Sequence, residues 1–326
     1  MISRRYRAHR RLWREGEDVN VTSLLYAIGY ETRSRFIADH SIAPSEDSLA
    51  IEYSSNRTLS FQVNKEQAER KKHLIVSDEG SALDTTVSAF LDRQLDMGRP
   101  IVLGVDVSAM NRSIMATVLL AACERLRSGD RLVILYSPAK FRKPSLDLLP
   151  LRTFGPVHPD LTGALGDPSR NRSIVIGLGY EYGVSLNVLD SHEPDMSFVF
   201  RPVGFDPRFL ESMEEANFGF DFGERNYEVI DYNLDDIPRL VGTLDGLFLS
   251  AKHSTNITCV PFGPKIFSAA CIFTAALHRP DVSVLRYSLS DLVDPNDVEA
   301  DGSIVGCEIE FLNQKPRLPQ HDHSDQ

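Results

Sequence analysis

The sequence is poor in the residue patterns that identify common catalytic centres. Its four cysteines are scattered, with no Cys-x-x-Cys pair, and its nine histidines include no His-Glu-x-x-His or similar metal-ligand spacing. Neither a Gly-x-Ser-x-Gly turn nor a complete Walker loop occurs. These absences argue against zinc sites, α/β-hydrolases and P-loop NTPases. We therefore expect no metal, no cofactor and four reduced cysteines in the core.

Long apolar runs are absent as well. The longest are as short as strands or are broken by charged residues, so the sequence predicts no membrane span. The N-terminus lacks the apolar segment of a secretory signal, and we expect a cytoplasmic protein. With 326 residues, 42% of them hydrophobic and 25% charged, the chain is large enough for two globular domains.

Positive charge is in deficit overall and is concentrated at the N-terminus. The formal net charge is −11, but the first fourteen residues contain six arginines, one histidine and no acid. We expect residues 1–20 to form a basic arm outside the fold. Two interpretations stay open: the arm contacts RNA or an acidic protein, or it is a frayed tail without a partner.

Two landmarks recur along the chain at nearly the same spacing. The triplet Gly-Tyr-Glu follows an apolar run at 29–31 and recurs at 179–181. A strand, a short polar loop, a small-residue helix and a strand ending in Tyr-Ser occupy 101–137, and the same succession occupies 257–288. Repeated landmarks in the same order indicate a duplicated unit. We predict an α/β fold of two Rossmann-like, doubly wound lobes related by internal duplication.

Composition and hydrophobic patterns divide the chain into regions. Continuous apolar runs indicate buried strands, and residues 81–97 show the spacing of an amphipathic helix. Residues 61–65 are expected to form a short strand. The predicted regions are the arm at 1–20, lobe 1 at 21–137, a Pro- and Gly-rich linker at 138–172, lobe 2 at 173–312 and a disordered tail at 313–326.

The loops at the carboxyl ends of the central strands are the candidate binding site, because open parallel sheets bind ligands there. In each Gly-Tyr-Glu loop the glycine permits a tight turn, the tyrosine can stack on a base or sugar, and the glutamate can accept hydrogen bonds from a ribose or a base. The alternative is a turn whose glutamate caps the next helix. The candidate residues of these two loops are Gly29, Tyr30, Glu31, Arg33, Ser34, Gly179, Tyr180 and Glu181.

The loops that precede the two small-residue helices form a second pair of candidates. Gly263 and Lys265 lie between a strand and a helix, where backbone amides and a lysine bind anions. Arg112 is expected to take the part of Lys265 in lobe 1. Helix capping by polar side chains is the alternative. The candidate residues here are Asp106, Ser108, Asn111, Arg112, Gly263, Lys265 and Ser268.

The loop with Gly263 and Lys265, between its strand and its helix, resembles the second motif of CARF domains, usually a Thr-Gly-Gly-Thr-Lys-like run. Gly29, Ser34 and Gly179 match the loop after the first strand, which is the first motif of that family. Two CARF-like units in one chain are similar to the SAVED arrangement. The resemblance implies a Rossmann-like sensor of cyclic or linear oligonucleotides in antiviral defence, and we expect its effector to be a separate protein.

Three functions are compatible with these patterns. The first is recognition of a nucleotide-type ligand between the lobes, by a sensor or accessory protein of a defence or stress system. The second is an enzyme that cleaves or transfers N-glycosidic bonds of nucleosides or NAD, with Glu31 or Glu181 as the catalytic carboxylate. The third is a protein-interaction scaffold that binds no small ligand. Because no complete catalytic set is present, the residues favour binding over catalysis.

Overall fold

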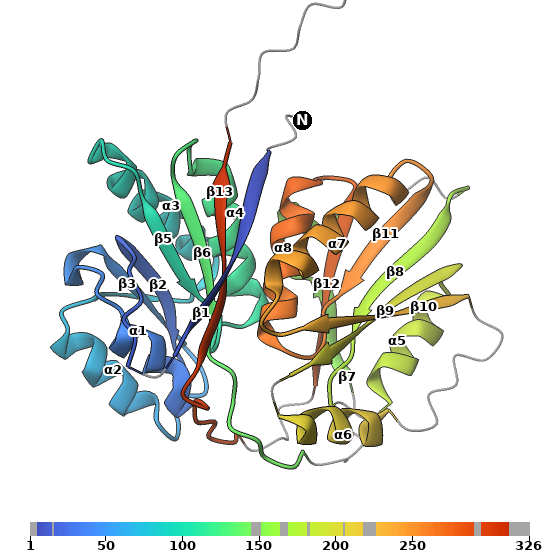
Figure 1. The fold of residues 1–326 in the computed structure, drawn as a ribbon, viewed down its shortest axis with the longest axis horizontal. Helices are drawn as coiled ribbons and strands as arrows, with labels where there is room; N and C mark the ends of the chain where they lie inside the picture. Colours follow the sequence, from blue (N-terminus) through green and yellow to red (C-terminus); the bar gives the residue numbers. More distant parts are fainter. Residues whose placement is uncertain are drawn as a thin grey trace, which may run out of the picture.

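The computed structural model describes residues 5–14, 16–144, 151–163, 169–180, 183–204, 206–217, 226–289 and 295–312. Within them the chain forms two α/β lobes that lie side by side, one around each of two sheets (Figure 1). The tail predicted at 313–326 lies outside the described residues.

The first sheet contains seven strands among the described residues, in the order β1-β13-β6-β5-β2-β3-β4. The strands from β6 to β4 are parallel, β13 is antiparallel to β6, and β1 is antiparallel to β13. These strands are β1 (Tyr6–Trp13), β2 (Ser23–Ile28), β3 (Ser48–Glu52), β4 (Leu74–Ser77), β5 (Val102–Asp106), β6 (Arg131–Tyr136) and β13 (Ile304–Phe311).

The second sheet has the order β10-β9-β8-β11-β12-β7 in the described part of the chain. Its strands are parallel except β7, which is antiparallel to β12. They are β7 (Leu151–Pro156), β8 (Asn171–Gly177), β9 (Met196–Val203), β10 (Tyr227–Asn233), β11 (Thr255–Val260) and β12 (Val282–Leu289).

The parallel parts of the two sheets share one strand order. Numbered along the chain within each lobe, the parallel strands run 3-2-1-4-5 in both, which is the order of the first five strands of the doubly wound dinucleotide-binding fold. The prediction of an α/β fold with two Rossmann-like lobes is therefore confirmed. Their origin by internal duplication stays a prediction.

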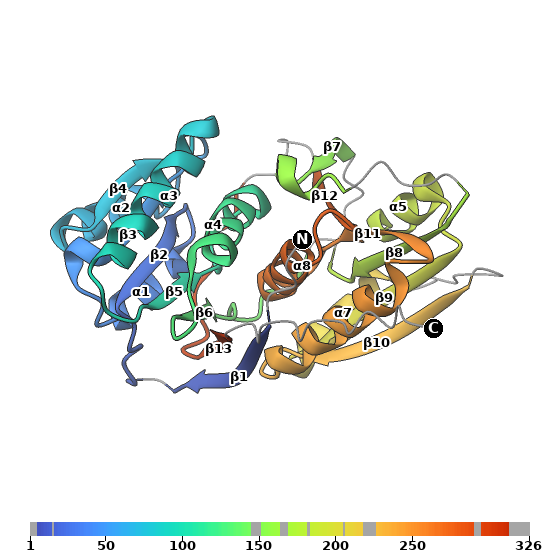
Figure 2. The ribbon, with the colours of Figure 1, turned by 90° about the horizontal axis from the view of Figure 1, so that it is seen from above.

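Helices cover both faces of each sheet, and the two inner helical layers pack against each other. Figure 2 shows α4 and α8 next to each other between the sheets, where they are in contact. The helices are α1 (Phe36–His40), α2 (Phe61–Arg70), α3 (Gly80–Asp96), α4 (Arg112–Arg125), α5 (Val184–His192), α6 (Pro207–Ala216), α7 (Ile237–Ala251) and α8 (Lys265–Leu277), with short 3₁₀ turns at Thr32–Arg35, Ser45–Asp47 and Pro159–Leu161.

The core follows from the alternation of side chains along strands that are buried on both faces. In β2, Leu24 packs into the cluster with α1 and α2, whereas Leu25 packs into the cluster with α3 and α4. That second cluster continues through α4 into α7 and α8, so both lobes share one hydrophobic core. The predicted reduced cysteines are confirmed as free and buried: Cys123, Cys259, Cys271 and Cys307.

The prediction that the basic segment lies outside the fold is wrong for residues 6–13, which form the edge strand β1. Tyr6 packs on Phe273 of α8 with ring centroids 5.5 Å apart, and Arg10 forms an ion pair with Asp235. Strand β1 therefore contacts the second lobe. Contact of its arginines with RNA or an acidic protein stays a prediction.

The last described strand also differs from the predicted boundaries. Residues 304–311, which we assigned to lobe 2, form β13 and insert between β1 and β6 of the first sheet. The predicted linker at 138–172 contains β7, which extends the second sheet. Sheet membership of such strands depends on partners distant in the sequence, which local patterns do not reveal.

Residues 61–65 begin helix α2 and do not form the predicted strand. The buried residues of α2 are Phe61, Asn64 and Ala68, which are spaced as on one helical face. A five-residue window is too short to separate this spacing from strand alternation.

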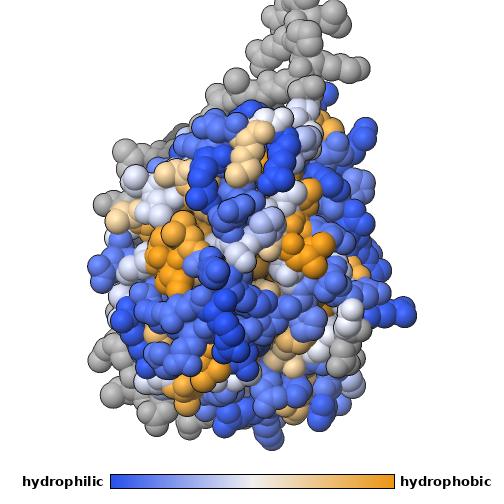
Figure 3. Space-filling view, turned by 90° about the vertical axis from the view of Figure 1, so that its left-hand side faces the viewer, coloured by the Kyte–Doolittle hydropathy of each residue, from blue (hydrophilic) through white to orange (hydrophobic). Residues whose placement is uncertain are grey.

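The outer end of the first lobe is mostly hydrophilic, with separate apolar patches (Figure 3). The exposed large apolar residues of this lobe include Ile42, Leu59, Val63, Leu74 and Met97. In the part of the chain that the structure describes, no helix combines the length and apolarity needed to cross a membrane.

Candidate functional site

A cavity of about 290 Å³ lies between the lobes, at the carboxyl ends of β8, β9 and β11. The neighbours β8 and β11 lead into α5 and α8, which pack on opposite faces of the sheet, and a crevice opens where such connections diverge. The lining residues are Arg33, Tyr136, Pro138, Ala139, Phe141, Leu178, Gly179, Tyr180, Pro202, Gly204, Asp206, Phe209, Met213, Leu234, Gly263, Pro264, Lys265 and Asp301.

Gly263 brings the two loops of this crevice into contact. Its φ is +75°, and a Cβ atom at this position would lie 2.2 Å from the carbonyl oxygen of Leu178. Any other residue would force the loops after β8 and β11 apart. Glycine is therefore required here by the protein's own packing, whether or not a ligand also approaches it.

Lys265 is the first residue of α8, and Pro264 is its N-cap. The amino end of a helix carries partial positive charge, to which the lysine adds a full charge. Because both residues line the cavity, this side of it is suited to an anionic group.

Aromatic side chains form another part of the cavity wall. Tyr180 and Phe209 lie nearly parallel, with ring centroids 6.2 Å apart and planes at 26°. Phe141 meets Phe209 edge-on at 5.1 Å and 86°. Such rings offer flat apolar surface against which a planar ligand can stack.

Arg33 reaches the cavity from the first lobe. Its side chain forms an ion pair with Glu31 at 2.6 Å, donates to the carbonyl oxygen of Ser137 at 3.5 Å, and the residue is only 7% exposed. Burial alone would lower the pKa of Arg33, but Glu31 and Tyr136 outweigh it and raise the pKa above its ordinary value. The guanidinium is therefore permanently charged and fixed in place.

The corresponding crevice of the first lobe is occupied by the protein itself. The Tyr53 hydroxyl donates to the carbonyl oxygen of Ala109 at 2.8 Å and accepts from the backbone N–H of Asn111 at 2.6 Å. A Cβ atom on Gly29 would lie 2.9 Å from Ser34 Oγ and 3.7 Å from the Tyr53 ring. Tyr53 thus lies between the loops after β2 and β5, where a ligand would otherwise bind.

A carboxylate occupies the turn that follows this loop. Asp297 accepts from the backbone N–H of Thr32 at 2.6 Å and from the Thr32 hydroxyl at 2.7 Å. Burial alone would raise the pKa of Asp297, but the bonds from Thr32 and Ser60 outweigh it and lower the pKa. Asp297 therefore supplies, from within the chain, the negative charge that an anionic ligand would bring.

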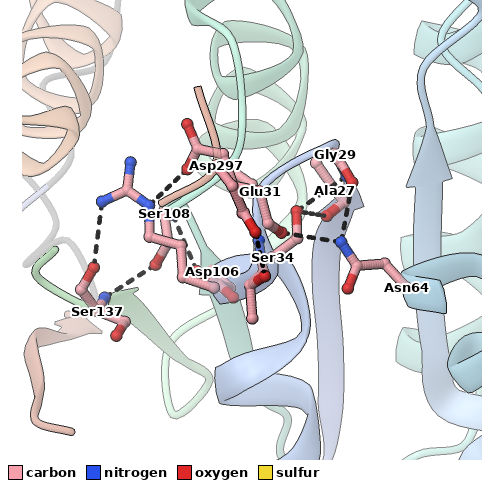
Figure 4. A network of polar contacts seen from close by, with 12 residues as sticks. Ala27, Gly29, Glu31, Ser34, Asn64, Asp106, Ser108, Ser137 and Asp297 are labelled. Carbon is pink, nitrogen blue, oxygen red and sulfur yellow. Dashed lines mark hydrogen bonds and ion pairs between the residues drawn. The ribbon is translucent and has the colours of Figure 1, made fainter. Parts of the chain in front are cut away.

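The other predicted polar residues hold these loops together. Ser34 accepts from the Gly29 N–H, Ser108 accepts from the Ser137 N–H, and Asp106 accepts from the Ser108 N–H (Figure 4). Asn111 accepts from the N–H of Ile114 and so caps α4, while Arg112 and Ser268 both donate to the carbonyl oxygen of Pro261. These polar side chains therefore cap helices and connect loops, and helix capping was the alternative to ligand binding in the sequence analysis.

The predicted site residues therefore fall into two groups. Five of them line the cavity: Arg33, Gly179, Tyr180, Gly263 and Lys265. Nine do not: Gly29, Tyr30, Glu31, Ser34, Asp106, Ser108, Asn111, Arg112 and Ser268. Glu181 lies outside the described residues. The loops of the two lobes contribute unequally to the cavity, because lobe 2 supplies most of the wall.

Two asparagines with a shared task were missed from the sequence. Asn64 donates from Nδ2 to the carbonyl oxygens of Gly29 and Glu31, at 2.9 and 2.8 Å. Asn217 donates in the same way to the carbonyl oxygen of Gly179 at 3.0 Å. They lie 35 and 38 residues after these glycines, and that shared spacing is the signal that could have identified them.

A larger cavity of about 500 Å³ lies at the opposite edge of the second sheet. It is lined by Arg170, Arg172, Lys252 and Asp281 among others, near the amino ends of β8, β11 and β12. Helices of a parallel α/β fold turn their carboxyl ends to this edge, and ligands of such folds bind at the other one. We therefore assign the candidate site to the smaller cavity. Within the described ranges, no three His, Cys, Asp or Glu residues cluster as metal ligands would.

Comparison with known proteins adds little to this site. No family model and no curated protein matches the chain. Among solved structures, a leucoanthocyanidin reductase–NADPH complex from Vitis vinifera is 12% identical, with 80% of this chain and 92% of that chain covered and a TM-score of 0.23. A ketoreductase of phoslactomycin biosynthesis from Streptomyces sp. HK803 is 10% identical, with coverages of 86% and 80% and a TM-score of 0.19. At such scores, neither likeness indicates what this chain binds.

Proposed function

We propose that the inter-lobe cavity binds a nucleotide-type ligand. The observation that carries this proposal is the combination in one crevice of a lysine at a helix amino end, a fixed arginine and an aromatic wall. Phosphate, sugar and base require these three kinds of surface. The crevice also lies at the switch point where doubly wound folds bind ligands.

Each part of the ligand has a counterpart in the wall. Lys265 and the start of α8 hold a phosphate, while the rings of Tyr180 and Phe209 stack on the base. Arg33 is already paired with Glu31, so it contributes a positioned donor on the first-lobe side and little net charge.

A sensor or accessory role in a defence or stress system belongs to the same proposal. It depends on the CARF-like sequence resemblance and requires a separate effector protein as partner. In that role, the ligand would act by holding the two lobes in one arrangement, because residues of both line the cavity.

The N-glycosidic enzyme receives less support from the geometry. Glu31 is engaged with Arg33 at 2.6 Å and does not line the cavity, whereas a catalytic carboxylate must reach the sugar. Glu181, the other candidate carboxylate, lies outside the described residues. The described part of the site therefore supports binding without bond cleavage best.

The substitution Lys265→Met tests this function. Losing a charge-assisted hydrogen bond costs about 1–3 kcal/mol, so nucleotide affinity should fall by about tenfold or more. The measurement is isothermal titration calorimetry with nucleoside monophosphates, with mass spectrometry of each ligand afterwards to detect cleavage.

Lys252→Met provides the matched control, because Lys252 lines only the cavity at the opposite edge of the sheet. It should leave nucleotide affinity unchanged. If wild-type protein binds no nucleotide, the proposal fails and the scaffold interpretation is favoured. If both variants bind nucleotide as tightly as wild type does, the assignment of the ligand to the cavity beside Lys265 fails. Recovery of a cleaved ligand would favour the enzyme instead.

A further inference from the structure

We propose, resting on the function above, that the ligand is a single nucleotide carrying one phosphate, and that polyphosphates, dinucleotides and cyclic oligonucleotides are excluded. Three independent features of the structure support this: the cavity's size, the balance of its charges and the occupied crevice of the first lobe. This specificity differs from the oligonucleotide specificity that the sequence resemblance implies.

The size of the cavity limits the ligand. Ligand pockets usually measure about 300–1,000 Å³, and the inter-lobe cavity, at about 290 Å³, lies at the lower end of that range. One nucleotide occupies the lower part of this range, and each further nucleotide adds a comparable volume. A second base or sugar would therefore have to lie outside the cavity.

The charges of the described lining residues balance. Arg33 and Lys265 are offset by Asp206 and Asp301. Arg33 is paired with Glu31 and Asp206 with Arg208, and the charges of Glu31 and Arg208 are opposite, so these two partners leave the balance unchanged. A polyphosphate brings several negative charges into one place and requires an excess of cations to offset them.

The position of these charges also favours one phosphate. Asp301 accepts from the N–H and the hydroxyl of Ser303, at 2.8 and 2.7 Å, and is held at the first-lobe side of the cavity. Lys265 lies at the amino end of α8 on the second-lobe side. In the described part of the wall, Lys265 is the electropositive point that suits a phosphate, because Arg33 is paired with Glu31. A chain of phosphates extending toward the first lobe would approach the carboxylate of Asp301.

The first lobe offers no second half-site among the described residues. A ligand with two equivalent halves, such as a cyclic dinucleotide, needs two equivalent crevices, and the cavity described above lies at the crevice of the second lobe. In the first lobe, Tyr53 binds both Ala109 and Asn111, and Asp297 occupies the Thr32 amide. Opening that crevice would break hydrogen bonds without replacing them.

The aromatic wall then accounts for one base. The rings of Tyr180 and Phe209 are nearly parallel, and the ring of Phe141 contacts Phe209 edge-on. One planar group can therefore stack on the exposed side of this aromatic wall. Stacking of a base on an aromatic side chain tolerates different bases, because every base has a flat π-face. We therefore expect the protein to discriminate by ligand size and phosphate number more than by base.

The test is a calorimetric affinity series on the full chain. It compares nucleosides, nucleoside monophosphates, nucleoside triphosphates, a linear dinucleotide, a cyclic dinucleotide and NADPH. Monophosphates should bind best, at least tenfold more tightly than the triphosphates and every dinucleotide. In Lys265→Met, the preference for monophosphate over nucleoside should disappear, while nucleoside affinity stays within twofold of wild type.

Phe209→Leu adds a second variant that keeps an apolar side chain but removes the ring. It should weaken nucleosides and monophosphates equally, by about fivefold or more, since the variant loses base stacking and leaves the phosphate contacts in place. Phe154→Leu is the control, because Phe154 is 60% exposed and does not line the cavity.

The outcomes separate the two proposals. Tightest binding of a triphosphate, a dinucleotide or NADPH would overturn the single-nucleotide inference and leave nucleotide binding intact. An absence of binding by every member of the series would overturn both.

Discussion

At the scale of single residues, the buried carboxylate of Asp106 braces the loop after β5, but its ionisation lowers the stability of the fold. Asp106 is 1% exposed at the end of β5 and accepts from the Ser108 N–H at 2.9 Å. Burial raises the pKa of Asp106 to about 6, although the bonds from Ser108 and the charge of Arg33 oppose that shift. Polar residues such as this are predictable candidates from the sequence, but their burial against their own loops is not.

The raised pKa predicts how stability depends on pH. Between about pH 4 and 6 the folded state binds a proton at Asp106 that the unfolded state has lost, so stability falls as pH rises through this window. A shift of about two pH units corresponds to roughly 3 kcal/mol. Asp106→Asn should therefore increase the free energy of unfolding at about pH 7.5 by up to about 3 kcal/mol and change it little at about pH 4.

Urea unfolding of wild type and Asp106→Asn at about pH 4, 5, 6 and 7.5 measures this difference. Asp92→Asn is the control, since the Asp92 side chain is 60% exposed and a surface change of this kind alters stability by about 0.5 kcal/mol or less. A variant less stable than wild type at the highest pH would show that the ionised carboxylate stabilises the fold.

At the scale of elements, the site depends on how closely two strand ends approach. Strands β8 and β11 lie side by side, and the loops that follow them touch at Gly263 and Leu178. The succession of strand, loop and helix was predicted from the apolar runs, because buried parallel strands are continuous in the sequence. The contact between the two loops was not predicted, since a long stretch of chain separates them.

We predict opposite effects for two glycine-to-alanine substitutions. Gly263→Ala places a methyl group 2.2 Å from the Leu178 carbonyl oxygen at a positive φ, and should destabilise the protein by about 2 kcal/mol or more. Gly246→Ala lies within α7 with nothing within 4 Å of the new methyl group, and should stabilise it by about 0.5–1 kcal/mol.

Chemical denaturation of both variants measures these changes. Nucleotide affinity should also fall in Gly263→Ala and stay unchanged in Gly246→Ala. A neutral Gly263→Ala would mean that the two loops separate easily, and would contradict the close approach described here.

At the scale of the whole molecule, the two lobes form one cooperative unit. Their inner helices share one hydrophobic core, β1 carries the first sheet across to α8, and β13 brings the chain back to the first lobe. Arg112 adds a hydrogen bond between the lobes, from its Nε to the carbonyl oxygen of Pro261 at 2.7 Å.

We therefore expect calorimetry to show a single unfolding transition with equal calorimetric and van't Hoff enthalpies. Arg112→Met should lower the free energy of unfolding by about 1–3 kcal/mol, because the Pro261 carbonyl loses a charged donor, without splitting the transition. Arg125→Met, which removes an ion pair with the exposed Asp92, should change it by about 0.5 kcal/mol or less. Two separate transitions in wild type would contradict the shared core.

Neighbouring residues in the chain were enough to predict much of the local structure, but not the start of helix α2 at residues 61–65. Strands are recognisable as continuous apolar runs, and the repeated Gly-Tyr-Glu and Tyr-Ser landmarks indicate two Rossmann-like lobes, because both signals come from residues close together in the sequence. Long-range packing instead determines that β1 and β13 complete the first sheet. It also determines that Tyr53 occupies one crevice while the other stays open beside Lys265. Those outcomes depend on contacts between distant segments and on side-chain volume, which a repeat in the sequence does not encode.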